Sequence, residues 1–533
     1  MSCMFSRKII LAMFILVALP VLVSAERANA TLYYVATTGS DSNPGTSSQP
    51  LRTITKGVLK LSAGDTLYVA SGTYTDSIDT WKVPFGNGIS WSTPITVAAQ
   101  PGHTVTIKPS NGNPFFWIAQ SQNKYLIIKG FIIDGQNTNT HGFKLEGFAK
   151  YVRVIDCEVK NFRASGILVT GNTESFHEFI NLNIHHNGAS NLDHGIYLTS
   201  GNNLVERSEV HHNKGYGIHL YNGNTTAANN NIIRNNRVHD NTTTGQWGCG
   251  ILLSSGNGNQ AYNNVVFGNF AGLCSQNRVS NSRIFNNHTY ENKVYGIYVG
   301  YSSTSGTRVE NNTVYKNGTY GIFSGDGATT TTAKNNIAYS NTINFGLTNT
   351  SSSNNLDTDP LFVNAVAKDF HLQSNSPAID KGTTISGLST DFDGKPRPKG
   401  SQFDIGAHEY QGTSTTSSTS TTSTSSTSTS STSTSSTSTS SFPPPLISPA
   451  PGSTLTSSTV TFTGAHNTKY PEQEHMLRVG TTNGGSQIYY QSMGTNHSVT
   501  VSGLPTSGTI YVMYWTRIST GWFQQTHTYT MKR

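Results

Sequence analysis

Residues 193–221 read DHGIYLTSGNNLVERSEVHHNKGYGIHLY, and this stretch holds two copies of one short pattern. Each copy opens with a glycine and an isoleucine, at Gly195 and at Gly217, and continues as a short β-type run. A glycine followed by an apolar residue recurs at Gly166, Gly195, Gly217, Gly250, Gly272, Gly296, Gly321 and Gly346. Neighbouring copies lie 22 to 33 residues apart, so this part of the chain is an internal repeat.

A second column of residues keeps the same period. Asparagine occurs at Asn187, Asn213, Asn241, Asn269, Asn292, Asn317 and Asn341. Three residues before each one lies a small or β-branched residue: Ile184, Val210, Val238, Val266, Thr289, Val314 and Ala338. The position after that holds a ring: His185, His211, His239, Phe267, Tyr290, Tyr315 and Tyr339. Two columns with one period make coincidence improbable.

This repeat predicts a right-handed parallel β-helix, an all-β solenoid. The segments between the columns are short β-type runs broken by Asn, Gly, Ser and Thr, with no helical periodicity. Successive coils stack at about 4.8 Å, so equivalent residues form ladders along the axis. Stacked asparagines can hydrogen-bond from coil to coil, and stacked rings bury area against one another. The ring column, including His185, His211 and His239, is therefore interpreted as scaffold.

The remaining sequence predicts the domain order. Residues 1–25 combine a basic start, an apolar run and a small-residue site, which is typical of a secretory signal peptide. The later segments are interpreted as follows: an N-terminal cap with the first coils (26–130), regular coils (131–350), the last coils with a C-terminal cap (351–412), a Ser/Thr linker (413–441) and a small β-sandwich (442–533). Leu51, Ile54, Val58 and Leu61 are spaced for one face of a short capping helix. No later segment is apolar enough to span a membrane, so a secreted or cell-surface protein is expected.

Composition narrows the class of partner. The chain has 35 Lys and Arg against 28 Asp and Glu, and removal of Arg7 and Lys8 with the signal leaves a small positive excess. With 12% charged residues there is no basic block of the kind that nucleic acid needs, whereas a mildly positive surface suits an acidic polysaccharide. Three cysteines follow the signal, Cys157, Cys249 and Cys274. An odd number with no zinc spacing predicts small core residues rather than a disulfide framework.

Three segments resemble known families. YYVATTGSDSNPGT (33–46), followed by AGDTLYVASGTY (63–74), resembles the opening of exported pectate-lyase-like β-helix proteins. DGKPRPKGSQFDIGAHEY (393–410) is similar to the choice-of-anchor ending of bacterial β-helix surface proteins. The last domain, from PAPGSTLTSSTVTFTG (449–464) to SVTVSGLPTSGTIYVMYW (498–515), looks like a fibronectin-type or immunoglobulin-like module. These resemblances imply architecture and leave the chemistry open, because the superfamily contains lyases, epimerases, hydrolases and non-enzymatic adhesins.

The outward face of the strands after the recurring glycine carries the candidate site. The second and fourth residues after each glycine should point outward, and they are aromatic or hydroxylic, with no carboxylate among them from Gly166 onward. Glycoside hydrolysis needs paired carboxylates and a calcium-assisted lyase needs clustered acidic oxygens. The acidic groups of calcium-dependent pectate lyases and the Asp-Pro-His motif of alginate epimerases are not recognisable. No metal and no cofactor is therefore expected.

Metal-independent β-elimination fits this face. It needs a cation for the uronate carboxylate, a base for the C5 proton and an acid for the leaving oxygen. Tyr197, His219 and Tyr221 are the candidate catalytic residues, together with Arg207 as the cation. The candidate substrate-binding residues are Asp193, His194, Lys214, Gln276 and Tyr298. Arg207 also interrupts a second asparagine column: Asn181, Asn235, Asn263, Asn286, Asn311 and Asn335.

The candidate catalytic residues also have interpretations that involve no catalysis. Tyr197, His219 and Tyr221 also suit a surface on which sugars stack without being cleaved. Arg207 also suits an ion pair with a carboxylate of its own or a neighbouring coil, as do Glu206 with Arg234 and Glu209 with Arg237. Two functions therefore remain open. One is an exported protein that binds an acidic polysaccharide and, if catalytic, cleaves it as a lyase; the other is a non-catalytic surface or adhesion protein whose residues 442–533 contact a cell surface.

Overall fold

The computed structural model describes residues 30–110, 112–119, 123–171, 175–223, 227–241, 248–412, 446–450, 452–464, 474–481, 488–518 and 521–532. The predicted signal peptide (1–25) and Ser/Thr linker (413–441) lie outside these ranges. The chain divides into two compact units, Met1–Thr416 and Ser417–Arg533.

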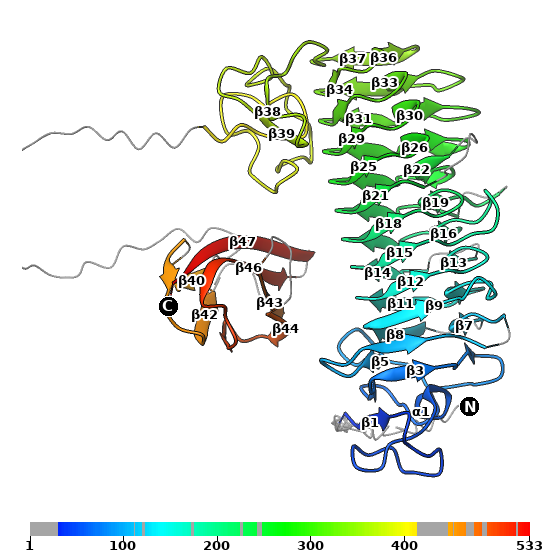
Figure 1. The fold of residues 1–533 in the computed structure, drawn as a ribbon. Coiled ribbons are helices and arrows are strands. Elements are labelled where there is room, and N and C mark those ends of the chain that lie inside the picture. The colour runs from blue at the N-terminus through cyan, green and yellow to red at the C-terminus, as the bar shows by residue number, and fades with distance from the viewer. Residues whose placement is uncertain are drawn as a thin grey trace, which may run out of the picture. The chain divides into compact units, whose positions relative to one another are not determined.

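The first unit is a parallel β-solenoid of three long sheets, with coils stacked from the N-terminal end upward (Figure 1). Sheet A contains β1 (Leu32–Val35), β2 (Thr66–Val69), β5 (Ile95–Ala99), β8 (Asn123–Lys129), β11 (Lys150–Ile155), β14 (Glu178–Ile180), β17 (Leu204–Glu206), β20 (Ile232–Arg234), β24 (Gln260–Tyr262), β28 (Arg283–Phe285), β31 (Arg308–Glu310), β34 (Thr331–Lys334) and β37 (Thr350–Ser353).

Sheets B and C follow sheet A in each coil. Sheet B contains β3 (Gly72–Tyr74), β6 (Val105–Ile107), β9 (Phe131–Asp134), β12 (Glu158–Lys160), β15 (Asn183–His185), β18 (Glu209–His211), β21 (Arg237–His239), β25 (Val265–Phe267), β29 (His288–Tyr290), β32 (Thr313–Tyr315) and β35 (Ile337–Tyr339). Sheet C contains β4 (Ile78–Asp79), β7 (Phe116–Ile118), β10 (Phe143–Leu145), β13 (Ile167–Val169), β16 (Ile196–Leu198), β19 (Ile218–Leu220), β22 (Cys249–Leu253), β26 (Ala271–Gln276), β30 (Tyr295–Gly300), β33 (Tyr320–Ser324) and β36 (Ile343–Leu347). A two-stranded pair, β23 (Gly256–Asn257) and β27 (Val279–Ser280), extends one corner.

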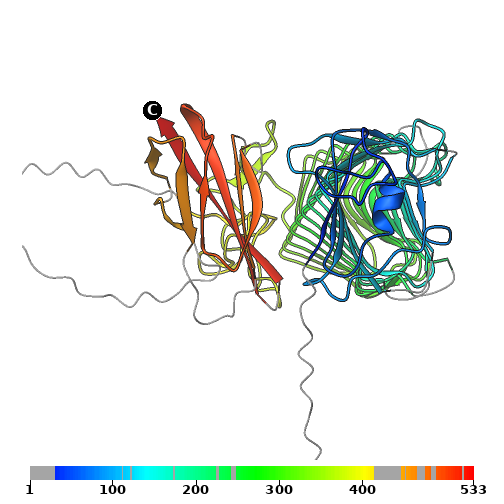
Figure 2. The same cartoon turned by 90° about the horizontal axis from the view of Figure 1, so that it is seen from below.

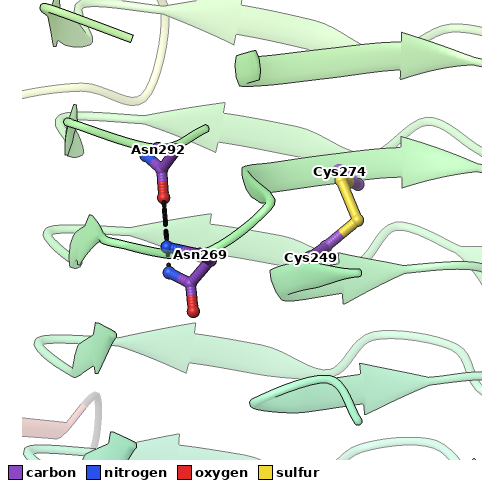
Figure 3. Close-up of a disulfide and its surroundings, with 4 residues drawn as sticks. All are labelled: Cys249, Asn269, Cys274 and Asn292. Carbon is purple, nitrogen blue, oxygen red and sulfur yellow. Dashed lines mark hydrogen bonds between the residues drawn. A yellow bond between two sulfur atoms is a disulfide. The ribbon is translucent and has the colours of Figure 1, made fainter. Parts of the chain in front are cut away.

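The glycine of one coil lies against the asparagine of the next coil, and the two predicted columns therefore have the same period. A Cβ on Gly217 would lie 2.9 Å from Nδ2 of Asn241 and 2.5 Å from Cγ1 of Val238, so only glycine fits there. The asparagines form the predicted ladder; for example, Asn269 Nδ2 donates to Asn292 Oδ1 at 3.3 Å (Figure 3). The Val210-type residues point inward into one continuous apolar core. The outer face of sheet B carries the predicted ring stack, in which His185, His211, His239 and Phe267 follow one another at 4.7–5.0 Å.

The column interrupted by Arg207 lies at turns. Asn181, Arg207 and Asn235 all have positive φ, between 51° and 58°. Asparagine is favoured there because it tolerates left-handed backbone better than other non-glycine residues. Some members also bond from coil to coil, as Asn335 Nδ2 does to Asn311 Oδ1 at 3.1 Å, and the buried ladder lies one residue later, where Asn236 Nδ2 donates to Asn264 Oδ1 at 3.0 Å. Arg207 therefore occupies a turn position next to that buried ladder and not within it.

The N-terminal end of the solenoid is closed by the predicted short helix. Helix α1 (Ile54–Val58) starts at Thr53, whose side chain accepts a hydrogen bond from the Lys56 N–H. Ile54 and Val58 are fully buried in the solenoid core. Seen along the axis, α1 lies across the open end of the first coils (Figure 2).

Residues 357–410, called the flanking segment here, pack along the side of the solenoid. They contain the hairpin β38 (Phe362–Asn364) and β39 (Asp369–Leu372), and Phe370 packs with Tyr290 of sheet B. Turn asparagines of the coils hold the segment: Asn286 Nδ2 donates to Thr390 O at 2.9 Å and Asn311 Nδ2 to Asp404 O at 3.0 Å. The segment therefore covers the sheet B ring ladder over its later coils.

The cysteines depart from expectation. Cys249 on β22 and Cys274 on β26 form a disulfide between adjacent coils (Figure 3). Only Cys157 is a free buried core residue as predicted. Counting cysteines missed the bond, whereas their separation of 25 residues, one coil length, indicates stacked positions.

The second unit has two sheets around one core. One sheet contains β40 (Leu446–Ser448), β42 (Val460–Gly464) and β45 (Ser498–Val501), and the other contains β41 (Thr454–Leu455), β43 (Glu474–Gly480), β44 (Tyr489–Gly494), β46 (Ser507–Ile518) and β47 (Gly521–Lys532). Phe462, Leu477, Ile510 and Tyr529 are buried between them, as in a β-sandwich. In the described part of the chain, no helix reaches the length and apolarity that a membrane crossing requires.

Candidate functional site

One residue of each coil points outward from the middle of sheet C. Parallel register places these residues in a column from the N-terminal coils onward: Trp117, Lys144, Leu168, Tyr197, His219, Leu252, Cys274, Tyr298 and Phe323. Adjacent members are about one coil, ~4.8 Å, apart. This column is the sheet C outer face, and it contains the predicted residues Tyr197, His219 and Tyr298.

Five rings of this face form a compact group, called the ring cluster here: His194, Tyr197, Tyr216, His219 and Tyr221. Tyr197 stacks on His219 with ring centroids 4.9 Å apart, and Tyr221 stacks on the same imidazole at 5.6 Å. His194 meets Tyr197 and His219 edge-on at 5.1 and 4.6 Å, and Tyr216 stacks on His194 at 4.9 Å. The structure thus brings four predicted residues together and adds Tyr216.

A hydrogen-bond chain fixes the proton positions of the two histidines. The Tyr216 backbone N–H donates to His194 Nδ1 at 3.1 Å, so the neutral His194 ring carries its proton on Nε2. That N–H points to His219 Nδ1, 3.0 Å away. His219 therefore accepts through Nδ1 and carries its own proton on Nε2. His219 is only 8% exposed, so this N–H is largely enclosed.

Burial keeps both imidazoles neutral. Removal from water lowers the pKa of His194 to about 4. Burial, together with the neighbouring His194, lowers the pKa of His219 well below 6.5. Burial and nearby Tyr221 raise the pKa of Tyr197, which therefore keeps its hydroxyl proton. The cluster is an uncharged set of ring faces and donors at neutral pH.

Three residues that sequence reasoning missed extend the site toward the N-terminus, and they are called the upstream trio here. Lys144 Nζ lies 2.6 Å from Glu146 Oε1 and 4.4 Å above the Trp117 ring, and Trp117 Nε1 donates to Glu146 Oε2 at 2.6 Å. The signal was present in the sequence, because Gly142-Phe143 continues the glycine column one step before Gly166. Glu146 also shows that this face does hold a carboxylate.

Asp193 and Lys214 lie in the turns that lead from sheet B to sheet C. Asp193 Oδ2 accepts from the backbone N–H of Ala189 at 3.1 Å and of Ser190 at 2.8 Å, so its carboxylate closes its own turn. Lys214 is exposed in the equivalent turn of the next coil, two residues before Tyr216. Lys214 is therefore a cation beside the ring cluster, whereas Asp193 mainly shapes the loop.

Arg207 lies elsewhere. It occupies the turn between β17 of sheet A and β18 of sheet B, whereas Tyr197 and His219 are on sheet C. Its Nη1 lies 3.1 Å from Glu206 Oε1, which also pairs with Arg234 Nε at 3.0 Å. The structure does not bring Arg207 to the ring cluster, and the ion pair in its own coil accounts for it.

The later half of the sheet C outer face is covered. Leu252, Cys274 and Tyr298 are buried in a small apolar cluster with the disulfide. Tyr298 is 3% exposed and its hydroxyl donates to Asp326 Oδ2 at 3.0 Å. Gln276 is 8% exposed. Both predicted binding residues are therefore packed inside rather than presented to a ligand.

Exposed aromatics border the N-terminal half. Trp81, just after β4, is 63% exposed, and Phe148, just after β10, is 56% exposed. A depression of about 380 Å³ adjoins β4, and its lining includes Thr55, Asp76 and Asp79. Asp79 is in register with Trp117, so the depression adjoins the start of the column. Open aromatic and charged groups thus gather from Trp81 to Tyr221.

Comparison with known proteins agrees with this architecture. The family described as "Pel9A-like, right handed beta helix region" matches residues 33–194, "Right handed beta helix region" matches residues 116–281, and "Periplasmic copper-binding protein (NosD)" matches residues 225–368. The first unit thus contains a right-handed β-helix region of the pectate-lyase-like kind. No curated protein matches the chain.

Several solved structures are similar. Pectate lyase Pel9A is 20% identical over 71% of this chain and 96% of its own, with a TM-score of 0.48. A rhamnogalacturonan lyase is 17% identical over 63% of this chain and 91% of its own, with a TM-score of 0.38. The A-module of mannuronan C-5 epimerase AlgE6 from Azotobacter vinelandii is 16% identical over 56% of this chain and 91% of its own, with a TM-score of 0.38.

Proposed function

We propose that the protein binds an acidic polysaccharide along the N-terminal half of the sheet C outer face. The observation that carries this proposal is the presence, on one face, of the partly exposed ring of Tyr197, which stacks on the buried His219, and of the partly exposed ammonium group of Lys144, which pairs with Glu146. A sugar ring presents apolar C–H faces that pack on aromatic rings, and a uronate adds a carboxylate that needs a cation or N–H donors.

The named groups divide these tasks. Tyr197, Tyr221 and Trp117 offer partly exposed rings in different coils, spaced along the face. Lys144, paired with Glu146, offers its remaining N–H donors, and the buried His219 supports the Tyr197 ring from the next coil. Because parallel coils repeat at about 4.8 Å, the face presents its groups at regular intervals, as an extended polymer requires. Gln276 and Tyr298 have no part in this proposal, since they are buried.

β-Elimination at the same face is a second candidate, favoured by the 4.9 Å stacking of Tyr197 on His219. In this reaction Lys144 or Lys214 neutralises the uronate carboxylate. The Tyr197 hydroxyl gives its proton to the leaving oxygen, and Tyr221, acting as its phenolate, takes the C5 proton, so that one proton is gained and one is given up. Arg207 is not part of it.

We also propose that the protein is exported. The N-terminal sequence has the three parts of a signal peptide. The Cys249–Cys274 disulfide supports this, since disulfides persist mainly in oxidising compartments outside the cytosol.

Titration of the full mature chain with pectate, alginate and glycosaminoglycan oligosaccharides tests the proposal. Binding is measured by calorimetry, and cleavage by the absorbance of the unsaturated product. We expect Lys144→Ala to weaken binding of the recognised polymer about tenfold, the loss of one charge-assisted contact. Lys160→Ala is a matched control, because Lys160 forms the same kind of pair with Glu158, also at 2.6 Å, on sheet B.

Tyr197→Phe separates binding from cleavage, because the variant keeps the ring stack and loses only the hydroxyl. If elimination occurs, the absorbance change is expected to fall while binding persists. Equal losses in Lys144→Ala and Lys160→Ala, or no binding of any of the three polymers, would contradict the proposal.

A further inference from the structure

The flanking segment and sheet B bring together four groups from distant parts of the chain. His288 begins β29, His371 lies on β39, Asp393 lies in the following turn, and His408 lies near the end of the segment. These residues lie on the outer face of sheet B, away from the sheet C outer face. The grouping has no part in the proposed polysaccharide site.

Three of these residues converge on one point. His371, Asp393 and His408 each offer a ligand atom, and these atoms lie within 4.8 Å of one another. Asp393 Oδ2 is 2.7 Å from His371 Nε2 and 3.2 Å from His408 Nδ1. A single carboxylate oxygen thus lies between two imidazole nitrogens on different segments.

A second carboxylate, that of Asp369, orients the outermost imidazole. Asp369 Oδ1 lies 2.5 Å from His371 Nδ1, on the ring edge opposite the shared point. His371 is hydrogen-bonded to carboxylates through both ring nitrogens, and a metal ion at the shared point would replace the proton on Nε2 while the Nδ1–H kept its bond to Asp369. Carboxylates that hold the far nitrogen of a histidine in this way are common around metal ions.

His288 provides an independent observation. Its side chain is 5% exposed, and its Nε2 is buried without a hydrogen-bond partner among the described residues. The ring stacks on Phe392 at 4.0 Å and lies 4.8 Å from the ring of His408. Buried polar nitrogens are normally paired, so an orphaned one beside two histidines and a carboxylate indicates a missing ligand.

We infer that His371, Asp393 and His408 bind a divalent transition-metal ion of the Zn²⁺ class beside the buried Nε2 of His288. Two or three imidazoles with one carboxylate are a donor set that suits Zn²⁺, whereas Ca²⁺ and Mg²⁺ take oxygen ligands.

The ion has a structural consequence. Its ligands come from β39, from the turn at 391–394 and from residue 408, so the bound ion would fix these three parts of the flanking segment to one another beside His288 of β29. A ligand that binds only the folded arrangement raises the unfolding temperature, and the stabilisation grows with the logarithm of its concentration relative to its Kd. The site therefore acts as a removable clamp on residues 357–410.

Zn²⁺ binding to the chelator-treated full chain tests this inference. A second group, His212 with His239 and Asp240, also offers three ligand atoms within 4.8 Å of one another. The His212→Asn substitution removes this group, so all variants are made in that background, and His212→Asn alone is the control. In that background we expect one Zn²⁺ per chain by calorimetry and a higher unfolding temperature with the ion. Co²⁺ used as a spectroscopic probe should give the absorption bands of a nitrogen-coordinated ion.

Asp393→Asn and His371→Asn are expected to weaken Zn²⁺ binding at least ~100-fold and to remove the Co²⁺ bands, and Asp369→Asn to weaken binding by about 10–100-fold. His371 is half exposed, so its replacement should leave the metal-free unfolding temperature close to that of the parent. Zn²⁺ binding that persists unchanged in Asp393→Asn, or its absence from the parent, would overturn the inference. Neither result depends on polysaccharide binding.

Discussion

The two halves of the sheet C outer face have the same parallel strand arrangement, and they differ in the side chains that point outward from each coil. In the N-terminal half, Lys144 and Tyr197 are only partly buried and stand beside exposed aromatics. In the later half, Leu252 and Tyr298 take the same register positions and are buried around a disulfide. The solenoid therefore fixes where side chains point, and the residue at each position decides whether the face is open or packed.

Loss of the disulfide is expected to give the largest effect on the packed half. Replacing both Cys249 and Cys274 with Ala should lower the free energy of unfolding by about 3 kcal/mol, because the bond closes a loop of about 25 residues in the unfolded chain. Denaturant unfolding measures it, with the parent protein under reducing conditions as the control. Polysaccharide affinity should not change; a matching loss of affinity would show that the halves are not separate.

Acid is expected to lower the free energy of unfolding through the buried histidines of the N-terminal half. The folded pKa of His194 is about 4, against an ordinary 6.5 when unfolded, so the unfolded chain binds more protons between those values. Stability should therefore fall as the pH drops from about 6.5 toward 4. His194→Gln should reduce this fall by at most roughly 3 kcal/mol. Unfolding curves at pH 7 and pH 4.5 measure it, and an unchanged pH dependence in the variant would contradict the neutral-pair assignment.

Aromatic truncation compares the halves directly. Tyr221 and Phe323 are partly exposed rings on sheet C, one in each half. Tyr221→Ala should weaken polysaccharide binding about three- to tenfold, the value of one lost ring contact, whereas Phe323→Ala should leave the affinity unchanged. Calorimetric titration of both variants measures this, and an equal loss in each would place the binding surface along the whole face.

The smallest effect is expected at Arg207. Arg207→Asn gives the turn the residue that most coils have at this left-handed position and removes one ion pair with Glu206, which keeps Arg234. The free energy of unfolding should change by less than about 1 kcal/mol, and polysaccharide affinity should not change. A clear loss of affinity in this variant would return Arg207 to the site.

The fold followed from sequence because repetition enforces it. Asn241 and Gly217 are adjacent in space, so neither can vary without the other, and the repeat is visible in the letters. Four members of the ring cluster were also predicted from the sequence, because they differ from the residues at the equivalent positions of the other coils. Trp117, Lys144 and Glu146 were not predicted, although Gly142-Phe143 shows the same glycine pattern one coil before Gly166.

Contacts across coils were harder to predict. Burial of Tyr298 and Gln276 depends on neighbouring coils and the disulfide, which alternation along one strand does not reveal. Arg207 was predicted at the site, although it lies at a turn away from it. An asparagine column can arise from coil-to-coil hydrogen bonds or from left-handed turns, and the sequence alone does not distinguish these two causes. The contact of His408 with His288 joins residues more than a hundred positions apart, so no local pattern contains it.

Hydroxyl-radical footprinting with and without the recognised oligosaccharide tests the central claim most directly, because it reports the solvent exposure of individual side chains. The account predicts that the oligosaccharide protects Trp117, Tyr197 and Tyr221 from oxidation. It predicts no change at Phe323 of the later half or at Tyr262 of sheet A. Protection centred on Phe323 or on sheet A, with Tyr197 unprotected, would contradict it.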